Sequence, residues 1–395
     1  MANKNLTKAK KAKNDEFYTQ WSDIEREVQA YLEYNPDAFR GKTILLPCDD
    51  PEWSNFTKYF ALHFNDYGIK KLISTSYAVE SKNYEVNYQL SLFEQNDPKF
   101  DETKTRVRGK LFVLERKGNK KINIDNLQWD YMDGDGDFRS DEVKQLRNEA
   151  DIIITNPPFS LFREFLAWIV EADKQFLIIG NLNAITYKEV FPLLKHNKVW
   201  LGNNYKVNGG AMFYEIPEEI ANLEQVREIK IKETGERVYI TRVQGVRWFT
   251  NLDHGRRHQP LPLMTMADNF KFSKHKEIKG LENFIRYDNY NAIEVSYVDA
   301  IPSDYSGMIG VPVSILDKYC PEQFIILGTS DNGLVDDEYK ITQGLTQKFV
   351  DDYYDAGGKG AYKEGNPTAG MYVNGIATMV YKRIFIKHKG DNQCQ

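Results

Sequence analysis

Residues 151–159 read DIIITNPPF, and they give the clearest structural signal in the chain. The run Asp151–Thr155 has an apolar centre and ends at a proline-rich turn, which is typical of a strand buried on both faces of a parallel sheet. Beyond the turn, Ser160–Asp173 has apolar residues at helical spacing and predicts a helix with one apolar face. A buried strand followed by an amphipathic helix indicates an α/β protein.

The same alternation occurs on both sides of this unit. We expect a first strand at Thr43–Leu46, a helical stretch at Trp53–Phe64 and a second strand at Lys71–Ser74. Further elements are expected at Arg108–Glu115 (hairpin strand), Phe176–Gly180 (strand), Lys188–His196 (helix), Lys198–Leu201 (strand) and Val246–Thr250 (antiparallel hairpin strand). This order predicts an α/β fold with a doubly wound sheet.

The composition of the sequence and the length of its segments change near residue 254. Residues 14–253 contain the alternating pattern, with polar insertions near 80–130 and 203–245. After residue 254 the segments are short and rich in proline and glycine, which favour turns. We therefore expect a basic N-terminal arm at 1–13, a main domain at 14–253 and a more irregular domain at 254–395.

The composition is that of a globular protein, because 41% of the 395 residues are hydrophobic and 28% are charged. No run approaches 18 apolar residues, and the segment MANKNLTKAKKAK lacks the apolar core of a secretion signal, so we expect neither membrane insertion nor export. Cys48, Cys320 and Cys394 do not have metal-ligand spacing. This argues against a structural zinc site and fits a reducing, cytoplasmic location, and we expect no metal among the site residues.

Two basic segments stand out against the net charge of −5. The first 13 residues contain no acid and five lysines: Lys4, Lys8, Lys10, Lys11 and Lys13. A second stretch, Arg242–Lys276, has seven Lys or Arg residues against Asp253 and Asp268. Local patches decide phosphate binding, but a solvated tail and an ordinary charged face have the same composition. Charge alone leaves both interpretations open.

The motif Asn156-Pro157-Pro158-Phe159 follows a strand end, where open α/β sheets bind ligands. An exocyclic amine such as adenine N6 is a poor nucleophile because its lone pair is delocalised into the ring. The Asn156 side-chain oxygen and the Pro157 carbonyl can each accept an N–H bond from that amine, which localises the lone pair for attack on a methyl sulfonium. The prolines fix the backbone, and Phe159 offers a face for a flipped base. The motif therefore predicts direct methyl transfer to an amine.

The alternative interpretation of this motif is a strand that ends in a proline turn without any function. Four such residues occur by chance in roughly one chain in a few hundred of this length, given about 5% usage of proline. The strand before the motif and the helix after it reduce that frequency, so the functional interpretation is favoured.

Two other turns are candidates for binding the methyl donor. The turn at 48–56 follows the first strand and lacks the Gly-x-Gly of a dinucleotide site, while its acids suit the ammonium and ribose hydroxyls of S-adenosylmethionine. The same residues are also ordinary helix-start chemistry. Asp133–Phe138 begins like a calcium loop, but Phe138 and Lys144 replace the required Gly and Glu, so calcium is not expected. We expect Asp137 to accept a hydrogen bond from the donor's adenine and Phe138 to stack on its ring.

With these motifs in place, the chain resembles the EcoRI-type adenine-specific (N6) DNA methyltransferase family. The resembling stretches are KAKKAKNDEFYTQ (8–20), CDDPEWSNFTKYF (48–60), GDGDFRSDE (134–142), TNPPFSLFRE (155–164), FLIIGN (176–181), ITYKEVF (185–191), WFTNLD (248–253), YDNYNAI (287–293) and GVPVSILDKYCPEQF (310–324). Residues 80–130, 203–245 and 328–380 do not align with the family pattern.

The resemblance implies a sequence-specific adenine-N6 methyltransferase that flips its target base, uses S-adenosylmethionine and acts on double-stranded DNA. It implies a cytoplasmic monomer of bacterial or phage origin, working in a restriction–modification system or as a stand-alone methylase. A cognate restriction endonuclease would act on the same site without a stable complex. The implied fold is a Rossmann-like methyltransferase sheet in the catalytic domain 14–253, with a loop-rich α+β target-recognition region at 254–395.

The resemblance also assigns residues to the parts of the site. The catalytic motif is Asn156, Pro157, Pro158 and Phe159, and the expected donor-binding residues are Phe17, Tyr18, Thr19, Cys48, Asp49, Asp50, Ser54, Asn55, Ser76, Tyr77, Asp137 and Phe138. Ser76 and Tyr77 stand where many methyltransferases have a ribose-binding acid. The residues expected to contact the target base or the DNA are Phe213, Tyr214, Arg242, Arg256, Arg257, His258, Lys8, Lys10, Lys11 and Lys13. The arginines among them are suited to reading guanine.

Two other functions compete with this interpretation. An RNA or protein-glutamine methyltransferase would use the same Asn-Pro-Pro-aromatic motif, but the basic stretch and the extended resemblance disfavour it. A non-catalytic DNA-binding protein would keep the fold alone. The intact Asn156, Phe159, Asp137 and Thr19 argue against such a decayed enzyme.

Overall fold

The computed structural model describes residues 18–52, 54–78, 101–116, 127–203, 211–216, 226–230, 237–330, 337–341, 344–366 and 368–390. The chain divides into two compact units. Unit 1 comprises the described residues of Met1–Leu182 and Leu201–His254, and unit 2 comprises those of Asn183–Trp200 and Gly255–Gln395. No described helix has the length and apolar character that crossing a bilayer requires.

Unit 1 is built on an eight-stranded mixed sheet. Its strands are β2 (Thr43–Leu46), β3 (Lys71–Thr75), β4 (Lys110–Glu115), β5 (Trp129–Tyr131), β6 (Ile152–Thr155), β7 (Gln175–Asn181), β8 (Trp200–Leu201) and β12 (Val246–Thr250). They lie in the order β5-β4-β3-β2-β6-β7-β12-β8. The four central strands, β3, β2, β6 and β7, are parallel, whereas β4, β5 and β12 pair antiparallel.

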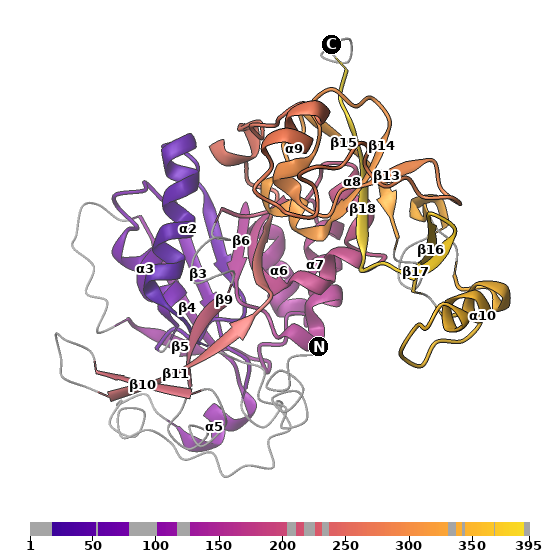
Figure 1. The fold of residues 1–395 in the computed structure, drawn as a ribbon. Helices are drawn as coiled ribbons and strands as arrows, with labels where there is room; N and C mark the ends of the chain where they lie inside the picture. The colour runs from indigo at the N-terminus through magenta and orange to yellow at the C-terminus, as the bar shows by residue number, and fades with distance from the viewer. Residues whose placement is uncertain are drawn as a thin grey trace. The chain divides into compact units, whose positions relative to one another are not determined.

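Helices cover both faces of this sheet, which makes unit 1 an α/β structure (Figure 1). On one face α2 (Trp21–Tyr34) packs against α3 (Asn55–Leu62), and α6 (Asp141–Glu149) and α7 (Phe162–Glu171) lie on the other. A short helix, α5 (Glu102–Val107), precedes β4. The chain passes from β2 to β3 on one side and later from β6 to β7 on the other, so the strand order reverses between β2 and β6.

A second, four-stranded sheet in unit 1 has the order β1-β9-β11-β10 and is antiparallel throughout. Its strands are β1 (Tyr18–Thr19), β9 (Ala211–Ile216), β10 (Val226–Lys230) and β11 (Arg237–Gln244). Strand β1 thereby joins the start of the described chain to a segment about 200 residues later, since Thr19 pairs with Tyr214.

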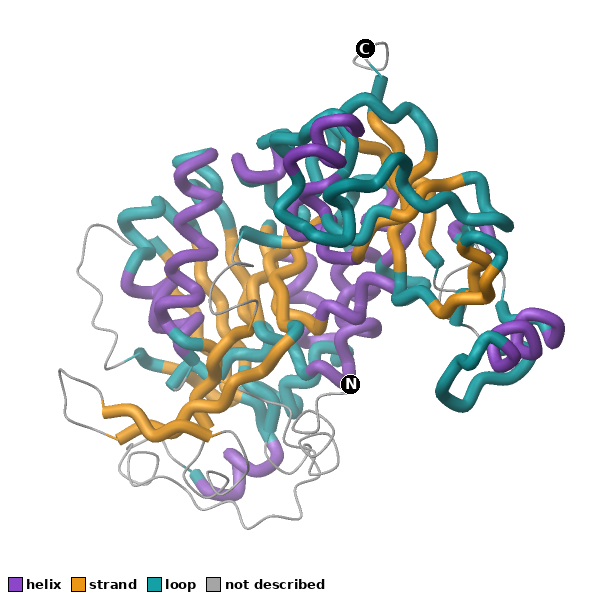
Figure 2. Tube along the Cα trace, in the orientation of Figure 1, coloured by secondary structure: helices purple, strands orange, loops and turns teal. Residues whose placement is uncertain are grey.

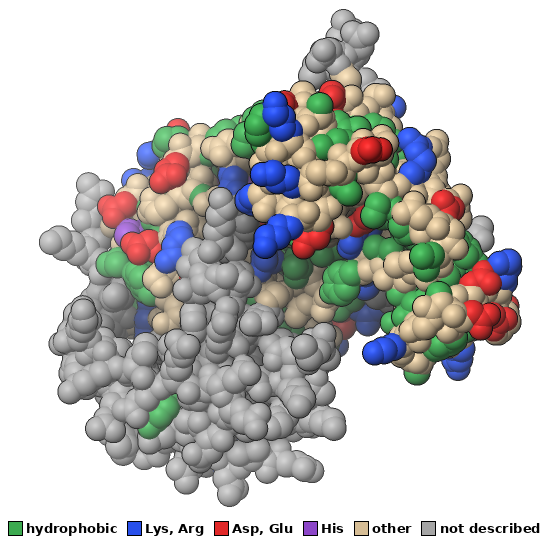
Figure 3. Space-filling model, in the orientation of Figure 1, with side chains coloured by type: hydrophobic (Ala, Val, Ile, Leu, Met, Phe, Trp, Pro, Cys, Tyr) green, Lys and Arg blue, Asp and Glu red, His purple; other side chains and the backbone are tan. Residues whose placement is uncertain are grey.

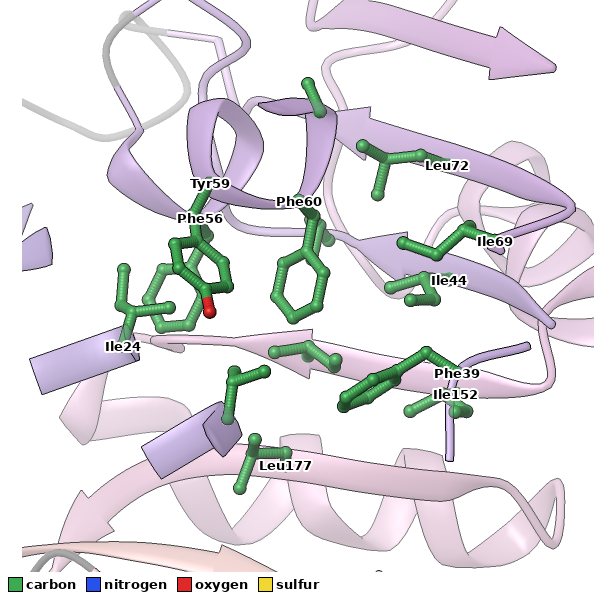
Figure 4. Close-up of a cluster of buried hydrophobic side chains, with 14 of the residues drawn as sticks. Ile24, Phe39, Ile44, Phe56, Tyr59, Phe60, Ile69, Leu72, Ile152 and Leu177 are labelled. Carbon is green, nitrogen blue, oxygen red and sulfur yellow. The ribbon is translucent and has the colours of Figure 1, made fainter. Parts of the chain in front are cut away.

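The main core of unit 1 lies between the large sheet and the pair α2 and α3 (Figure 4). All four residues of β2 and of β6 are buried, as expected for strands covered on both faces. Aromatic residues of α3 fill the space above these strands, with Phe56, Tyr59 and Phe60 packed near Ile44 and Ile152. Burial of so much apolar surface is the main force that holds the sheet and helices together.

The expected strands of the central sheet are confirmed. Strand β2 has the predicted bounds, and β3, β6 and β7 differ from prediction by one or two residues. The expected antiparallel strand at Val246–Thr250 is confirmed as β12, but its partner is β7, which ends at Asn181, so the two strands do not form the expected hairpin. The strand expected at Arg108–Glu115 is β4, which begins at Lys110 and is antiparallel to both of its neighbours.

The expected helices exist but are shorter than predicted, for identifiable reasons. α3 begins at Asn55 rather than Trp53 because the Ser54 hydroxyl accepts hydrogen bonds from two amides of its first turn. The predicted helix at Ser160–Asp173 starts with a 3-10 turn, η3 (Phe159–Leu161), before α7 begins at Phe162. α7 ends at Glu171, two residues before the predicted end at Asp173, whose φ of 51° is not helical.

Unit 2 has more loop than regular structure (Figure 2). One mixed sheet has the order β13-β14-β18-β15, and β16 pairs with β17 in a separate two-stranded ribbon. The elements are η4 (Leu182–Thr186), α8 (Phe191–Lys195), η7 (Gly255–His258), α9 (Met266–Phe272), β13 (Ala292–Glu294), η8 (Val298–Ala300), β14 (Met308–Pro312), η9 (Val313–Lys318), β15 (Phe324–Thr329), η10 (Asp337–Tyr339), α10 (Gln347–Asp355), β16 (Gly370–Val373), β17 (Ile376–Met379) and β18 (Arg383–His388).

Candidate functional site

The Asn-Pro-Pro-Phe segment forms the turn between β6 and α7. Thr155 ends the strand, and the Leu161 amide donates to the Pro158 carbonyl at 2.9 Å, which closes the turn that leads into α7. Asn156 and Pro158 are partly exposed, whereas Pro157 is buried. Because β6 lies beside the reversal of strand order, this turn occupies the usual ligand-binding place of an open α/β sheet.

Phe159 is less accessible than expected from the sequence. It is 8% exposed and belongs to the main core cluster of unit 1. Its ring therefore supports the packing below the turn as well as forming the end of the motif, and a change at Phe159 affects stability and site together.

The buried carboxylate of Asp49 joins the loop after β2 to the end of β6. Thr155 Oγ1 donates to Asp49 Oδ2 at 2.5 Å, and Ser54 Oγ donates to Asp49 Oδ1 at 2.6 Å. The Asp49 amide donates to the Thr75 carbonyl at 3.0 Å, and the Ser74 hydroxyl donates to the Asp49 carbonyl. The ends of three parallel strands, β2, β3 and β6, are thus tied together through one residue, next to Asn156.

The rest of the first loop is held by a cation that sequence reasoning missed. Lys110 is buried, and its ammonium forms ion pairs with Asp50 at 3.4 Å and with Glu52. The same ammonium lies 4.8 Å from the centre of the Trp129 ring. Lys110 and Glu52 are 58 residues apart, so no local pattern in the sequence indicates that they meet.

The end of β3 contacts the turn that carries Asp137. Ser76 pairs with Lys110 through both backbone and hydroxyl, and the Ala78 amide donates to the Asp135 carbonyl at 2.7 Å. Only glycine fits at residue 136, where φ is 79° and a Cβ would lie 2.0 Å from the Ser76 carbonyl oxygen. The predicted donor residues Ser76, Tyr77 and Asp137 therefore lie in neighbouring segments.

Asp137 is paired with Arg139 two residues along the chain. The Arg139 amide and Nε both donate to Oδ1 at 2.8 Å, and a second guanidinium nitrogen donates to Oδ2 at 2.5 Å. Burial alone would raise the pKa of Asp137, but the hydrogen bonds and charge of Arg139 outweigh it and the pKa lies below its ordinary value. Asp137 is therefore an anion at neutral pH.

Phe138 is 5% exposed and packs edge-on against two aromatic rings of α7. Its ring centre lies 5.1 Å from that of Phe165 and 5.6 Å from that of Trp168. These contacts attach the Asp137 turn to the helix that follows the Asn156 motif.

Thr19 lies at the other side of the first loop. The Asn55 amide group donates to the Thr19 carbonyl at 2.8 Å, which links β1 to the start of α3. Thr19 is 3% exposed, and its hydroxyl makes no hydrogen bond with any residue in the part of the chain that the structure describes. A buried hydroxyl without a hydrogen bond destabilises the folded protein unless another group bonds to it.

Three residues predicted for the target base share the small sheet with Thr19. Tyr214 is the register partner of Thr19, and Arg242 on β11 is the register partner of Phe213 on β9. The backbone thus brings together residues that are up to 223 positions apart in the chain, which sequence patterns do not indicate. Phe17, Lys8, Lys10, Lys11 and Lys13 lie outside the described residues.

The predicted DNA-contacting residues of η7 lie in unit 2, and their side chains have partners there. Arg256 donates to the Asp317 carbonyl at 2.7 Å, and His258 Nδ1 lies 2.9 Å from a Glu322 oxygen. Arg257 is buried, with its guanidinium 3.7 Å from the centre of the Trp200 ring. DNA contact by these three residues stays a prediction.

The model of the family described as adenine-specific methyltransferase EcoRI matches residues 5–389. The chain is 40% identical to Type II methyltransferase M.EcoRI of Escherichia coli over 82% of its own length and 89% of that protein's. It is 32% identical to Type II methyltransferase M.MpnI of Mycoplasma pneumoniae over 82% and 84% of the two chains. The corresponding values for M.MgeORF184P of Mycoplasma genitalium are 33%, 81% and 84%. No solved structure matches the chain.

Proposed function

The chain belongs to the EcoRI family of adenine-specific methyltransferases, and we propose that it methylates N6 of a specific adenine in double-stranded DNA. The observation that carries this proposal is the hydrogen bond from Thr155 to Asp49. It joins the Asn-Pro-Pro-Phe turn to the loop after β2 at the reversal of strand order. This contact supports the proposal that the amine-activating motif and the expected donor loop belong to one site.

We propose S-adenosylmethionine as the methyl donor. Bound to the enzyme, it would supply an electrophilic methyl group on a sulfonium. The chemical character of the residues in unit 1 suits S-adenosylmethionine. The buried Thr19 hydroxyl lacks a hydrogen bond to a described residue, and Asp50 and Asp137 provide negative charge. A carboxylate has about four lone-pair positions, so Asp137 retains acceptor capacity beside its three bonds from Arg139.

The proposed mechanism depends on two acceptors at the β6–α7 turn. The Asn156 side-chain oxygen and the Pro157 carbonyl would accept the two N–H bonds of the target amine, which localises its lone pair. Pro157 and Pro158 restrict the backbone of the turn, so that these acceptors are held in place before the substrate arrives. Removal of a base from the stack is required because N6 is not accessible to such a site inside a duplex.

The wider assignments follow from the same proposal. Unit 1 would be a Rossmann-like methyltransferase domain, and the region 254–395 would recognise the target sequence. We propose that the enzyme acts as a cytoplasmic monomer in a restriction–modification system, and that its cognate endonuclease recognises the same site without stable association. The names of two relatives, Type II methyltransferases M.EcoRI and M.MpnI, support the assignment to a restriction–modification system.

The test is nucleoside analysis of mixed-sequence DNA incubated with the protein and methyl-labelled S-adenosylmethionine, followed by single-molecule sequencing of the product. Labelled N6-methyladenine at one short sequence motif is expected. Labelled N6-methyladenine spread over all sequences would contradict site specificity. If DNA stays unlabelled while RNA or protein glutamine becomes labelled in parallel reactions, the choice of DNA as the substrate would be overturned.

A further inference from the structure

A short basic segment of unit 2 has a charge opposite to that of its surroundings. Residues 271–279, KFSKHKEIK, contain Lys271, Lys274, Lys276 and Lys279 and one acid, Glu277. The region 255–395 as a whole has 16 Lys and Arg against 18 Asp and Glu. We call residues 271–279 the basic strip; it begins in the last turn of α9. Figure 3 shows Lys and Arg side chains gathered on the face of unit 2 where α9 lies in Figure 1.

The basic strip is held in place by its own packing. Ser273 and Ile278 are buried, while the residues around them are mostly exposed. The Gly280 amide donates to the Phe270 carbonyl at 2.8 Å, which closes the strip back onto α9. The Lys279 amide donates to the His275 carbonyl at 3.0 Å. The charges of the strip therefore project from an ordered backbone, so that binding would cost little additional conformational entropy.

The His275 ring anchors the centre of the strip. It stacks on Tyr297 with ring centres 3.6 Å apart and planes at 9°, and its Nε2 lies 2.8 Å from an Asp299 oxygen. Asp299 also pairs with Lys274 at 2.6 Å. The only acid of the strip, Glu277, accepts a hydrogen bond from the Tyr297 hydroxyl at 3.2 Å.

Three lysines of the strip remain available for a partner. Lys271, Lys276 and Lys279 are exposed, and none of them forms an ion pair with a residue that the structure describes. Phe272 lies among them with 59% of its surface exposed, and its ring centre is 4.9 Å from the Lys271 ammonium. Exposed lysines beside an exposed aromatic ring are typical of surfaces that bind nucleic acids.

The exposed lysines of the basic strip differ from Arg256 and Arg257, which belong to the basic stretch Arg242–Lys276. The side chains of Arg256 and Arg257 make internal contacts in unit 2, with the Asp317 carbonyl and the Trp200 ring. These guanidinium groups have contacts within unit 2, whereas the side chains of Lys276 and Lys279 are exposed.

We infer that the basic strip binds the phosphate backbone of DNA, with Lys271, Lys276 and Lys279 as the contacting cations. This inference rests on the proposed function for its ligand, but it concerns residues of unit 2, whereas the Asn156 motif belongs to unit 1. Lysine suits this role because its ammonium neutralises phosphate charge without reading a base.

The test compares two double variants by fluorescence anisotropy on a duplex that the wild type methylates, over a range of salt concentrations. Lys276→Ala/Lys279→Ala removes two charges of the strip. Lys359→Ala/Lys363→Ala removes two exposed charges elsewhere in unit 2 and serves as the matched control. Thermal unfolding verifies that both variants fold as the wild type does.

Removal of two phosphate contacts is expected to reduce the slope of log affinity against log salt by about 1.8, with on the order of tenfold or more weaker binding at 0.1 M salt. The control is expected to keep the wild-type slope. An unchanged slope in Lys276→Ala/Lys279→Ala, or an equal loss in the control, would overturn the inference. Failure of the wild type to methylate any DNA would overturn the proposed function instead.

Discussion

Thr155 and Asp49, which are 106 residues apart, are joined by a 2.5 Å hydrogen bond between the Thr155 hydroxyl and an Asp49 carboxylate oxygen. The residue after Thr155 is Asn156, and the residue after Asp49 is Asp50, so this one bond aligns the proposed catalytic turn with the proposed donor loop. Both side chains are buried, and the Ser54 hydroxyl holds the second carboxylate oxygen.

Thr155→Val should therefore destabilise unit 1. The substitution keeps the shape of the side chain but removes a hydrogen bond to a buried charge, which is expected to lower the free energy of unfolding by about 1.5–3 kcal/mol. Urea denaturation followed by circular dichroism measures this loss. Thr103→Val, at an exposed position of α5, is the matched control and should change stability by no more than about 0.5 kcal/mol. Equal effects of the two substitutions would show that the Asp49 bond contributes nothing.

Asn156→Ala should strongly reduce methylation while leaving the protein folded. Loss of one preorganised acceptor for the target amine is expected to reduce kcat by roughly 100- to 1,000-fold. Calorimetry with S-adenosylmethionine should give wild-type affinity, because Asn156 is proposed to bond to the target amine only. Asn283→Ala, at an exposed position of unit 2, is the control. Wild-type turnover in Asn156→Ala would exclude the proposed mechanism.

Phe159 requires a milder substitution because the side chain is part of the core. Phe159→Ala is expected to cost about 3–5 kcal/mol of stability, which would obscure any effect on catalysis. Phe159→Leu keeps most of the apolar volume at a cost of about 1.5 kcal/mol or less but removes the aromatic face. Its single-turnover methylation rate should fall by roughly tenfold, given about 1–3 kcal/mol for stacking of one base. An unchanged rate would mean that no base stacks on Phe159.

Lys110→Met should destabilise the first loop and weaken donor binding. It leaves the charges of Asp50 and Glu52 without their buried partner, at an expected cost of about 2–4 kcal/mol, somewhat reduced because both acids are partly exposed. Lys110→Arg retains the charge and should restore most of the binding of S-adenosylhomocysteine measured by calorimetry. Lys144→Met, which breaks an exposed pair with Asp141, should cost less than about 1 kcal/mol. Donor binding that is unchanged in Lys110→Met would refute a role for this cation at the site.

The Asp137–Arg139 pair predicts a dependence of stability on pH. The pKa of Asp137 in the folded protein is lowered, so the pair stabilises the fold above the ordinary carboxyl pKa of about 4. That contribution is lost as the pH falls through the lower, folded-state pKa. Because Arg139 is partly exposed, the difference in stability between the wild type and Arg139→Gln should be about 1 kcal/mol or less. Unfolding measured between pH 7 and pH 3 should show this difference constant above pH 5 and shrinking toward pH 3. A difference that grows toward low pH would contradict the assignment.

The local parts of the fold were predictable from the sequence. Strands β2 and β6 are short apolar runs bounded by turns, and their burial on both faces is encoded in that pattern. The Asn156 motif could be placed on a turn between a strand and a helix because prolines and the apolar spacing of the helix are local signals. Helix ends were less predictable, since they depend on single caps such as the Ser54 hydroxyl.

Contacts across the chain came from tertiary packing alone. Lys110 meets Glu52 because β4 lies antiparallel beside β3. The alternation of apolar and polar residues along either strand does not indicate which strand it pairs with. In the same way, the sequence gives no sign that Arg256 lies beside the Asp317 carbonyl or Arg257 beside the Trp200 ring, and only the packing of unit 2 brings these groups together. Sequence periodicity reports which face of an element is buried, whereas the partner of a buried charge is set by which elements pack side by side. The proposed amine-binding motif is therefore recognisable from nine consecutive residues, while only the folded chain shows that Lys110 supports the neighbouring loop.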